Sequence, residues 1–163
     1  MFTVGILTIS DKGYKGERKD LSGAAIREFV EKQGWTVKQQ HIVPDELLKI
    51  KTQLKRMADK YHCDLILTTG GTGFSPRDIT PEATKAVIER EVPGLVEYMR
   101  AESVKKIATA LLSRAVCGIR GQSLIVNLPG SPKGVKENLE FILPVLPHGL
   151  EKLKGDTKEC AIK

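Results

Sequence analysis

The sequence predicts an α/β protein with three α/β/α layers and a mostly parallel sheet. Short apolar runs alternate with longer segments whose apolar residues recur at helical spacing, which is typical of βαβ units. Loops rich in Gly, Pro, Ser and Asp separate these segments. The 163 residues, 40% of them hydrophobic, suit one domain with an ordinary core. We therefore expect residues 1–163 to form a single domain, in which one antiparallel hairpin strand lies beside the parallel strands.

The first strand and the first helix are predicted from the start of the chain. Residues 4–9 are continuously apolar enough for a buried strand, and a polar loop follows over residues 10–20. The first helix is expected to begin with Ser22 as its N-cap and to stop at Gly34. Its inward face is formed by apolar residues at helical spacing: Ala25, Ile26, Phe29 and Val30.

A second strand and helix and a third strand come next. Residues 35–43 predict the strand, and the helix is expected to begin at Pro44 to Glu46. The helix has an apolar stripe: Leu47, Ile50, Leu54, Met57 and Tyr61. Residues 64–69 predict the third strand because their centre is continuously apolar.

The segment that follows the third strand contains strong breakers. Residues 70–78 predict a loop from their glycines and Pro76. Thr80 is the expected N-cap of the next helix, because Pro81 suits the first helical position. Pro93-Gly94 interrupts this helical stretch, and a further helix is expected over residues 94–106.

The last third of the chain predicts a hairpin and a long helix. Residues 115–119 and 123–127 flank a short turn that contains glycine, as in a β-hairpin. The final helix is expected over about residues 134–154. Pro144 and Pro147 should kink or split it, because proline cannot continue a helix undisturbed.

Composition argues against several classes of protein. No apolar run approaches the roughly 20 residues of a membrane helix, and no basic segment with a cleavage site predicts a signal peptide. Cys63, Cys117 and Cys160 have no CxxC spacing, which predicts reduced thiols in a cytoplasmic protein. Aromatic residues make up 5% of the chain, too few for a platform that stacks bases.

The net charge of +6 is compatible with three interpretations. A basic patch binds nucleic acid in some proteins and a small anionic ligand such as a nucleotide in others. The third interpretation is a mildly basic solvated surface, because acidic residues are interspersed with the basic ones and no long Lys/Arg run occurs.

Polar loops follow the predicted strands at the ends where α/β sheets bind ligands. If the strands are parallel, these loops converge on one edge of the sheet. They are Ser10-Asp11, Pro44-Asp45, Gly70 to Gly73 and Asn127 to Ser131. The glycines of the third loop allow positive φ and close approach of the backbone, so their amides can point at an anion. The alternative for this loop is a tight turn between strand and helix.

Two aspartates and two cations in these loops are candidate site residues. Asp78 is either an ordinary loop residue or a carboxylate that faces the anion site and holds Mg²⁺. Asp45 is either a helix N-cap or the second member of a metal-and-positioning pair for phosphoryl chemistry. Arg77 and Lys133 either neutralise phosphate charge or belong to the ordinary surface. Asp64 lies at the opposite end of its strand and is expected to be structural.

Several of these segments resemble the signatures of the MogA/MoaB family of molybdenum-cofactor biosynthesis proteins. The resemblance covers residues 2–155 approximately, and its most specific part is the stretch that includes the glycine loop. The matching segments are Thr69 to Gly73, Ser75 to Thr84, Leu128 to Gly134, Ser10-Asp11, Asp20 to Gly23 and Val43 to Glu46.

The resemblance implies a molybdopterin-binding α/β fold, usually a homotrimer and in some cases a hexamer. MogA-type members are molybdopterin adenylyltransferases, which transfer AMP from Mg·ATP to the terminal phosphate of molybdopterin and release pyrophosphate. A MoeA-like partner then uses the product for metal insertion. MoaB-type paralogues, some of which bind molybdopterin without this activity, are the alternative. Neither nucleic acid nor a membrane is an expected partner.

The resemblance also assigns roles to residues of this chain. The two catalytic aspartates of the family match Asp45 and Asp78, and both are expected to hold Mg²⁺. Because both are present, the active MogA-type interpretation is favoured. The amides of the glycine loop, with Ser75, are expected to bind nucleotide phosphates. The full set of expected ligand contacts is Ser10, Asp11, Gly70, Gly71, Thr72, Gly73, Ser75, Arg77, Gly130, Ser131 and Lys133. The chain lacks an insertion before the final helix that some MogA members have.

Overall fold

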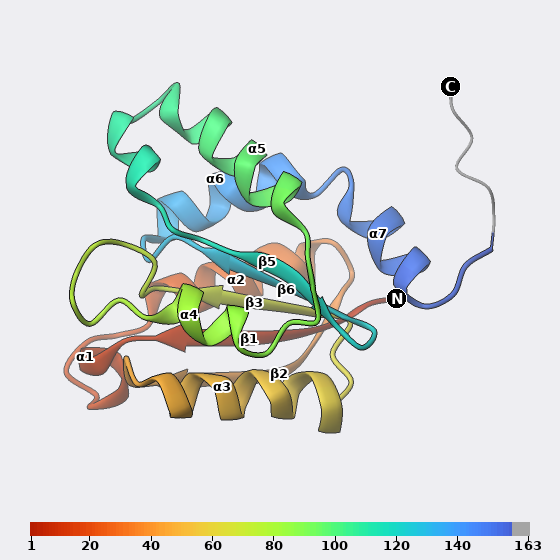
Figure 1. Cartoon of the computed structure of the whole chain (residues 1–163), viewed down its shortest axis with the longest axis horizontal. Helices are drawn as coiled ribbons and strands as arrows, with labels where there is room; N and C mark the ends of the chain where they lie inside the picture. Colours follow the sequence, from red (N-terminus) through yellow and green to blue (C-terminus); the bar gives the residue numbers. More distant parts are fainter. Residues whose placement is uncertain (158–163) are drawn as a thin grey trace.

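The computed structural model describes residues 1–157 and shows a six-stranded sheet covered by helices on both faces (Figure 1). The strand order is β2-β1-β3-β6-β5-β4, in which β5 runs antiparallel to β6 and β4 and the other neighbours are parallel. This confirms the predicted α/β fold with one antiparallel hairpin strand. The strands are β1 (Thr3–Ile9), β2 (Thr36–Val43), β3 (Leu65–Thr69), β4 (Arg90–Glu91), β5 (Cys117–Arg120) and β6 (Ser123–Leu128).

The helices form one layer on each face of the sheet (Figure 1). One layer consists of α2 (Leu21–Lys32), α5 (Pro93–Val104), α6 (Pro132–Ile142) and α7 (Leu146–Leu153). The other consists of α3 (Leu47–Lys55), its π-helical continuation η1 (Arg56–Lys60) and α4 (Thr80–Lys85). Two short elements complete the chain: α1 (Asp11–Tyr14) and the 3₁₀ turn η2 (Ala108–Leu112). None of the helices within residues 1–157 is long and apolar enough to cross a membrane.

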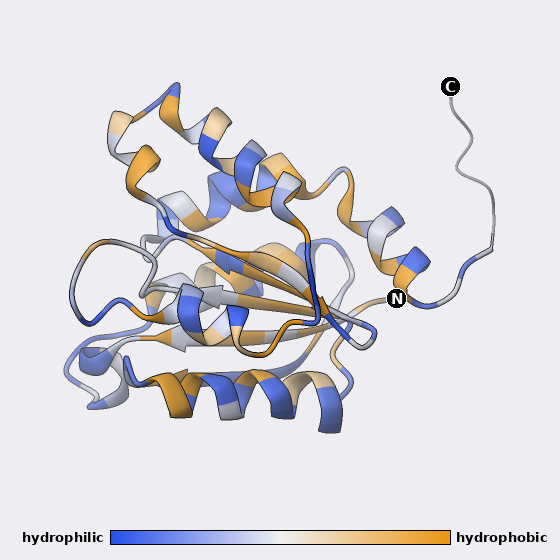
Figure 2. Cartoon of the chain, in the orientation of Figure 1, coloured by the Kyte–Doolittle hydropathy of each residue, from blue (hydrophilic) through white to orange (hydrophobic). Residues whose placement is uncertain are grey.

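The core follows the alternation of side chains along the parallel strands. Val4 and Ile6 of β1 pack in the cluster that includes α2, α5, α6 and α7. Leu7 and Ile9 of the same strand pack in the cluster with α3, η1 and α4. Because each fully buried residue of this kind contributes about 1.5–3 kcal/mol, a register slip would be strongly unfavourable. Figure 2 shows the apolar residues along the strands and on alternate turns of α3. The packing thus places the carboxyl ends of β1, β2, β3 and β6 at one edge.

The start of α2 differs from the expectation, whereas its end agrees with it. Asp20, not Ser22, is the N-cap, because the Asp20 carboxylate accepts hydrogen bonds from the Gly23 amide at 2.8 Å and from the Thr8 hydroxyl at 2.7 Å. The link to Thr8 ties the helix start to β1, which the local pattern could not indicate. Gly34 follows the C-cap with φ +72°, as expected of a helix-ending glycine.

Two other predicted caps are also wrong. The N-cap of α3 is Glu46, so the interpretation of Asp45 as a simple helix cap does not hold. Thr80 is the first residue of α4 and Ile79 is its cap. The Thr80 hydroxyl instead donates to the carbonyl of Gly70 at 2.9 Å, a tertiary contact that ties the helix start to the glycine loop.

Some short elements were not expected from the sequence pattern. The predicted polar loop over residues 10–20 contains α1, while β4 and η2 span five residues or fewer. Such elements are too short for apolar periodicity to reveal. The helix after residue 92 begins at Pro93 itself, since proline suits a first turn. The final helix is split into α6 and α7, as Pro144 and Pro147 predicted.

The two cysteines in the described part of the chain are buried free thiols. Burial raises the pKa of Cys63 to about 11 and that of Cys117 to about 12. Both side chains are therefore protonated and unreactive at neutral pH. The third thiol of the prediction, Cys160, lies outside the described residues.

Candidate functional site

The four polar strand ends converge as predicted. Beyond the carboxyl ends of β1, β2, β3 and β6 lies a cavity of about 560 Å³, which we name the aspartate cavity because Asp20, Asp45 and Asp78 line it. Its lining includes residues from each strand end: Ser10, Asp45, Gly70, Gly71, Gly130 and Ser131. This is the position at which open α/β sheets bind their ligands.

A second cavity of about 470 Å³ adjoins the first. We name it the α5 cavity, because Val96, Met99, Arg100 and Ser103 of that helix line it. Residues of η2 and α6 complete its wall. The lining of both cavities contains the same five residues: Gly70, Gly71, Asp78, Gly130 and Ser131. Two molecules bound in the two cavities would therefore meet at the glycine loop and Asp78.

The first two glycines of the loop after β3 are required by its geometry. Gly70 and Gly71 have φ of +94° and +66°. A Cβ on Gly70 would collide with the carbonyl oxygen of Ile9, and one on Gly71 would collide with the hydroxyl of Thr80. The same Cβ on Gly71 would lie 3.2 Å from Oδ1 of Asp45, so that carboxylate rests directly against the loop.

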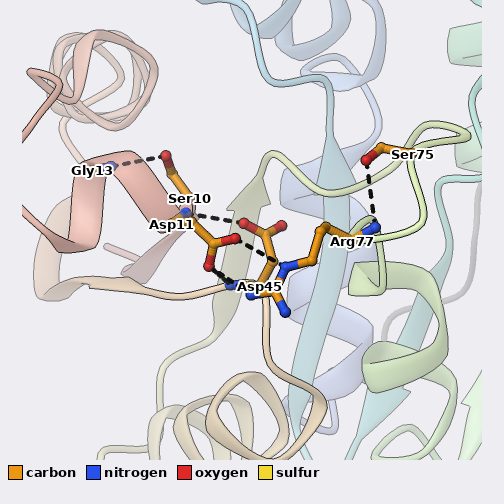
Figure 3. Close-up of polar contacts among 6 residues, drawn as sticks. All are labelled: Ser10, Asp11, Gly13, Asp45, Ser75 and Arg77. Atoms are coloured by element: carbon orange, nitrogen blue, oxygen red, sulfur yellow. Dashed lines mark hydrogen bonds and ion pairs between the residues drawn. The ribbon is translucent and has the colours of Figure 1, made fainter.

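Asp45 is held by a reciprocal contact with the loop that follows β1. The amide of Asp11 donates to Asp45 Oδ2 at 3.0 Å, and the amide of Asp45 donates to Asp11 Oδ1 at 3.0 Å (Figure 3). Ser10 caps α1 by accepting a hydrogen bond from the Gly13 amide at 3.0 Å. The ends of β1 and β2 are thereby joined, and the remaining oxygen of Asp45 is left toward the glycine loop.

Arg77 spans from the loop after β3 to the loop after β1. Its Nε and Nη2 atoms donate to Oδ2 and Oδ1 of Asp11 at 3.0 and 2.9 Å (Figure 3). The hydrogen bond from Arg77, together with that from the Asp45 amide, lowers the pKa of Asp11, and Asp11 in turn raises the pKa of Arg77. The predicted phosphate-binding cation is thus paired with a carboxylate, beside the cavity rather than in its lining.

Asp78 has the turn role that one interpretation gave it, and its role in holding Mg²⁺ stays a prediction. It is a turn residue, because its Oδ2 accepts from the Ser75 amide at 3.0 Å and its amide donates to the Ser75 carbonyl at 2.8 Å. It also lines both cavities. A Cβ on Gly73 would lie 2.9 Å from Oδ2 of Asp78, so both aspartates flank the glycine loop.

The remaining predicted residues differ in whether they line a cavity. Thr72 and Gly73 line the α5 cavity. Ser75 and Lys133 are exposed and line neither cavity, so their proposed ligand contacts stay predictions. Asp64 is structural, as expected: it accepts from the Thr3 amide at 2.7 Å and pairs with Lys154 at 2.9 Å.

Two cations of the aspartate cavity were missed. Arg18 and Lys19 line it, both are exposed, and neither forms a salt bridge within residues 1–157. The signal that could have found them is their place in the loop after β1, immediately before the matching segment that begins at Asp20. They add positive charge to the wall of the aspartate cavity.

The carboxylates suit a magnesium ion that arrives with a phosphate ligand. Within the described residues, no group of three or more His, Cys, Asp or Glu side chains could hold a metal ion. Asp45 and Asp78 provide two carboxylates on one cavity. Mg²⁺ is commonly bound by one or two carboxylates, waters and substrate phosphates, so this donor set fits that ion.

The environment of Asp45 predicts a pH-dependent stability. Burial, with the charges of Asp11 and Asp78, raises the pKa of Asp45, although the Asp11 amide opposes this. A carboxyl with a raised pKa stabilises the folded state while it is protonated, and this contribution is lost as pH rises through the folded-state pKa. Asp45→Asn should therefore raise the Tm at neutral pH, and the gain should vanish below about pH 4, near the usual pKa of Asp. Thermal unfolding across this pH range measures the effect.

Asp64→Asn is the matched control for this prediction. Burial opposes the shift, but the Lys154 and Thr3 contacts lower the pKa of Asp64. Its carboxylate therefore stabilises the fold at neutral pH, and its replacement should lower the Tm there. An Asp45→Asn protein that is less stable than the wild type at neutral pH would contradict the assignment.

The mostly parallel sheet, the glycine loop and the aspartate-lined cavities are typical of α/β proteins that bind small molecules at the carboxyl edge of the sheet. A family model described as "Probable molybdopterin binding domain" matches residues 5–148. The chain belongs to this family, as the motifs in its sequence indicated.

Individual relatives agree with this assignment. The chain is 46% identical over 155 residues to the molybdopterin adenylyltransferase of Helicobacter pylori strain J99, covering 94% of this chain and 88% of that protein. It is 42% identical to the molybdopterin adenylyltransferase of Escherichia coli K12, covering 90% and 78%. The crystal structure of the molybdopterin biosynthesis enzyme MoaB from Thermus thermophilus superimposes with a TM-score of 0.90 at 54% identity, covering 96% of this chain and 98% of that chain.

Proposed function

We propose that this protein is a molybdopterin adenylyltransferase of molybdenum cofactor biosynthesis, which transfers AMP from ATP to the terminal phosphate of molybdopterin and releases pyrophosphate. The observation that carries the proposal is the pair of adjoining cavities that share the glycine loop and Asp78. A transferase with two substrates needs two sites whose reacting ends meet. The names of the relatives in Helicobacter pylori and Escherichia coli support this activity.

The bond changes of the proposed reaction require no covalent enzyme intermediate. An oxygen of the terminal phosphate of molybdopterin attacks the α-phosphorus of ATP, and a new P–O bond forms. The bond from the α-phosphorus to the bridging oxygen of the β-phosphate breaks, and pyrophosphate leaves with the electron pair. The attacking phosphate oxygen is already ionised at neutral pH, so no general base is needed. Catalysis then depends on positioning and charge stabilisation.

Different residues of this chain would bind the phosphates of the two substrates. The amides of Gly70, Gly71 and Gly73 would bind nucleotide phosphates, with Ser75 as a further proposed contact. The loop from Ser131 to Lys133 would contact molybdopterin and its phosphate, with Ser10 and Asp11 nearby; Ser131 and Ser10 line the aspartate cavity. A ligand phosphate would compete with Asp11 for the guanidinium of Arg77, which the structure places beside the cavity.

Asp45 and Asp78 would hold Mg²⁺, which arrives with ATP. When bound, this ion neutralises phosphate charge and fixes the orientation of the reacting groups. The pKa of Asp45 is raised because its carboxylate is partly buried and lies close to the negative charges of Asp11 and Asp78. A bound cation would relieve that repulsion.

The test is an adenylylation assay with the purified protein. Molybdopterin and Mg·ATP together should yield adenylylated molybdopterin and one equivalent of pyrophosphate, measured by chromatography and by a pyrophosphatase-coupled phosphate assay. ATP without molybdopterin should yield none. If molybdopterin binds but no AMP is transferred, the protein is a binding module of the MoaB-type kind and the proposal fails.

The exposed cations of the aspartate cavity should contribute to substrate affinity. The double variant Arg18→Gln/Lys19→Gln should raise the KM of one substrate by about 2- to 30-fold, because each exposed ion pair contributes about 0.2–1 kcal/mol. The effect should shrink as salt is added. Steady-state kinetics at two ionic strengths measure it. Lys12→Gln/Lys15→Gln is the control, since it removes the same charge from the same loop but outside the cavity lining. Equal effects of the two double variants would contradict a role in binding.

The resemblance leaves further predictions in place. A homotrimer, a cytoplasmic location and a MoeA-like downstream partner remain proposed, and sedimentation velocity decides between trimer and hexamer. Exposed apolar side chains in and next to η2 support the association of copies of this chain: Ile107 is 60% and Leu111 is 65% exposed.

Duplex DNA should bind only weakly and without sequence preference at physiological salt, a property that a salt titration checks.

A further inference from the structure

Arg114 makes three contacts with the loop that carries the candidate site and one with the helix that follows it. It follows η2 and precedes β5, and its amide donates to the carbonyl of Thr72 at 2.9 Å. Its Nε donates to the carbonyl of Gly73 at 2.7 Å, and its Nη2 donates to the carbonyl of Asp78 at 2.8 Å. Its Nη1 pairs with Glu82 in the first turn of α4. One side chain thus binds the loop at both ends and the helix that follows.

Between those two carbonyls, the loop is tied to the rest of the molecule by Arg77, which pairs with Asp11 on the exposed side. In Figure 1 the loop bulges from the molecule between β3 and α4. Residues 74–77 are exposed, and the side chain of Phe74 is 69% exposed. Few buried contacts leave such a segment free to open locally. The contacts of Arg114 close its neck, next to Gly73 and Asp78 themselves.

The chemistry of the contact requires a guanidinium group. A planar guanidinium presents five N–H donors in a rigid fork, so that one group reaches two carbonyls and one carboxylate at once. A lysine ammonium is a point charge on a flexible stem and cannot hold the same three acceptors in one plane. Burial alone would raise the pKa of Glu82, but the hydrogen bond and charge of Arg114, with a backbone hydrogen bond and the charge of Lys85, together lower it.

The side chain of Arg114 lines neither cavity. Its neighbours Ser113 and Ala115 line the α5 cavity, whereas its side chain points to the loop. We therefore expect it to affect the reaction through the loop and Asp78.

We infer that Arg114 is a positioning residue, which clamps the neck of the 73–78 loop and so holds Asp78 and the glycine amides in the arrangement that AMP transfer needs. The inference rests on the proposed function for its kinetic consequence. Its structural consequence, closure of the loop, does not depend on any substrate.

Arg114→Lys tests the clamp in two ways. A misplacement of about 1 Å lowers turnover by about 100-fold, so kcat should fall by that order while the KM of each substrate changes by less than about threefold. Hydrogen exchange of the Ser75 and Asp78 amides in the ligand-free protein should accelerate by about tenfold or more, because loss of about 1.4 kcal/mol from the closed loop has that effect.

Two variants serve as controls. Arg120 makes an equivalent set of contacts at the other end of the sheet, with both oxygens of Asp59 at 2.8 and 2.7 Å and the Val87 carbonyl at 2.9 Å. Arg120→Lys therefore reports what loss of an arginine fork does to general stability, and its kcat should stay near that of the wild type. Glu82→Gln removes the ionic partner of Arg114 but keeps the two carbonyl contacts, and should reduce kcat only slightly.

The outcomes separate the alternatives. A fall in kcat no larger than that of Arg120→Lys, or unchanged exchange of the loop amides, would overturn the inference. If Arg114→Ala fails to fold, Arg114→Lys and Arg114→Gln decide the same question, since both keep most of the side-chain stem. If the wild type transfers no AMP, the proposed function fails, and the exchange measurement still shows whether Arg114 closes the loop.

Discussion

Replacing Asp78 with Asn is expected to lower kcat for AMP transfer by about 10²- to 10³-fold, the cost typical of removing one preorganised electrostatic contact. The amide of Asn keeps a carbonyl oxygen that can accept the hydrogen bond from the Ser75 amide, so the turn survives. The substitution removes only the negative charge from the wall shared by the two cavities. Steady-state and single-turnover kinetics, with unfolding curves for stability, measure the loss.

The control for Asp78 is another partly buried aspartate. Asp64→Asn also removes a hydrogen-bonded carboxylate, but at the opposite end of β3 and away from both cavities. It should lower the Tm and leave turnover nearly unchanged. Molybdopterin binding should largely survive in Asp78→Asn and in Asp78→Ala. Normal turnover in either variant would remove Asp78 from the catalytic machinery.

Replacing Gly71 with Ala should reduce both stability and turnover. The residue has φ +66°, where a side chain costs about 1–2 kcal/mol, and the new Cβ would collide with the Thr80 hydroxyl. Displacing a packed neighbour adds about 1–3 kcal/mol. Because Thr80 also donates to the Gly70 carbonyl, the whole turn must shift, and kcat should fall by more than about 100-fold. Denaturant unfolding and the adenylylation assay give the two quantities.

Gly34→Ala is the control that separates the cost of a positive φ from the cost of a steric collision of the new Cβ. Gly34 has φ +72°, but nothing lies within 4 Å of the position that its Cβ would occupy. This variant should lose only the cost of the positive φ, and its turnover should be that of the wild type. If Gly71→Ala is no less stable and no less active than Gly34→Ala, the glycine loop is not the close-packed cradle described above.

Much of the fold was accessible from the sequence because its signals are local. The mainly apolar residues 4–9 and the apolar centre of residues 64–69 correspond to central strands, and the glycine turn at Gly121 correctly indicated the hairpin. The helix caps were less predictable. Asp20, Asp45 and Thr80 have the residue types of caps, but only Asp20 is one. Asp45 lies one position before the cap of α3, and Thr80 lies one position after the cap of α4.

The candidate site was predictable in part for the same reason. Asp45, Asp78 and the glycines stand directly after strands, and the parallel sheet carries those positions to one edge. Arg18 and Lys19 stand in such a loop too, but a pair of basic residues on a basic chain is not distinctive. No local pattern marks Arg114, since its partners are Gly73 and Asp78, 41 and 36 residues away.

The sequence by itself therefore determined the α/β class, the order of the main elements and the family, and it singled out the glycines and aspartates of the candidate site. Periodicity, turn chemistry and motifs depend on neighbours along the chain, and these can be read without a structure. Three features were decided only by the tertiary structure. Asp11 forms hydrogen bonds with both Asp45 and Arg77, and Arg77 is 66 positions away along the chain. The two cavities share Asp78, and Arg114 binds the loop that carries it. Such contacts arise when packing of the sheet brings distant loops together, and nothing in the chemistry of adjacent residues specifies them.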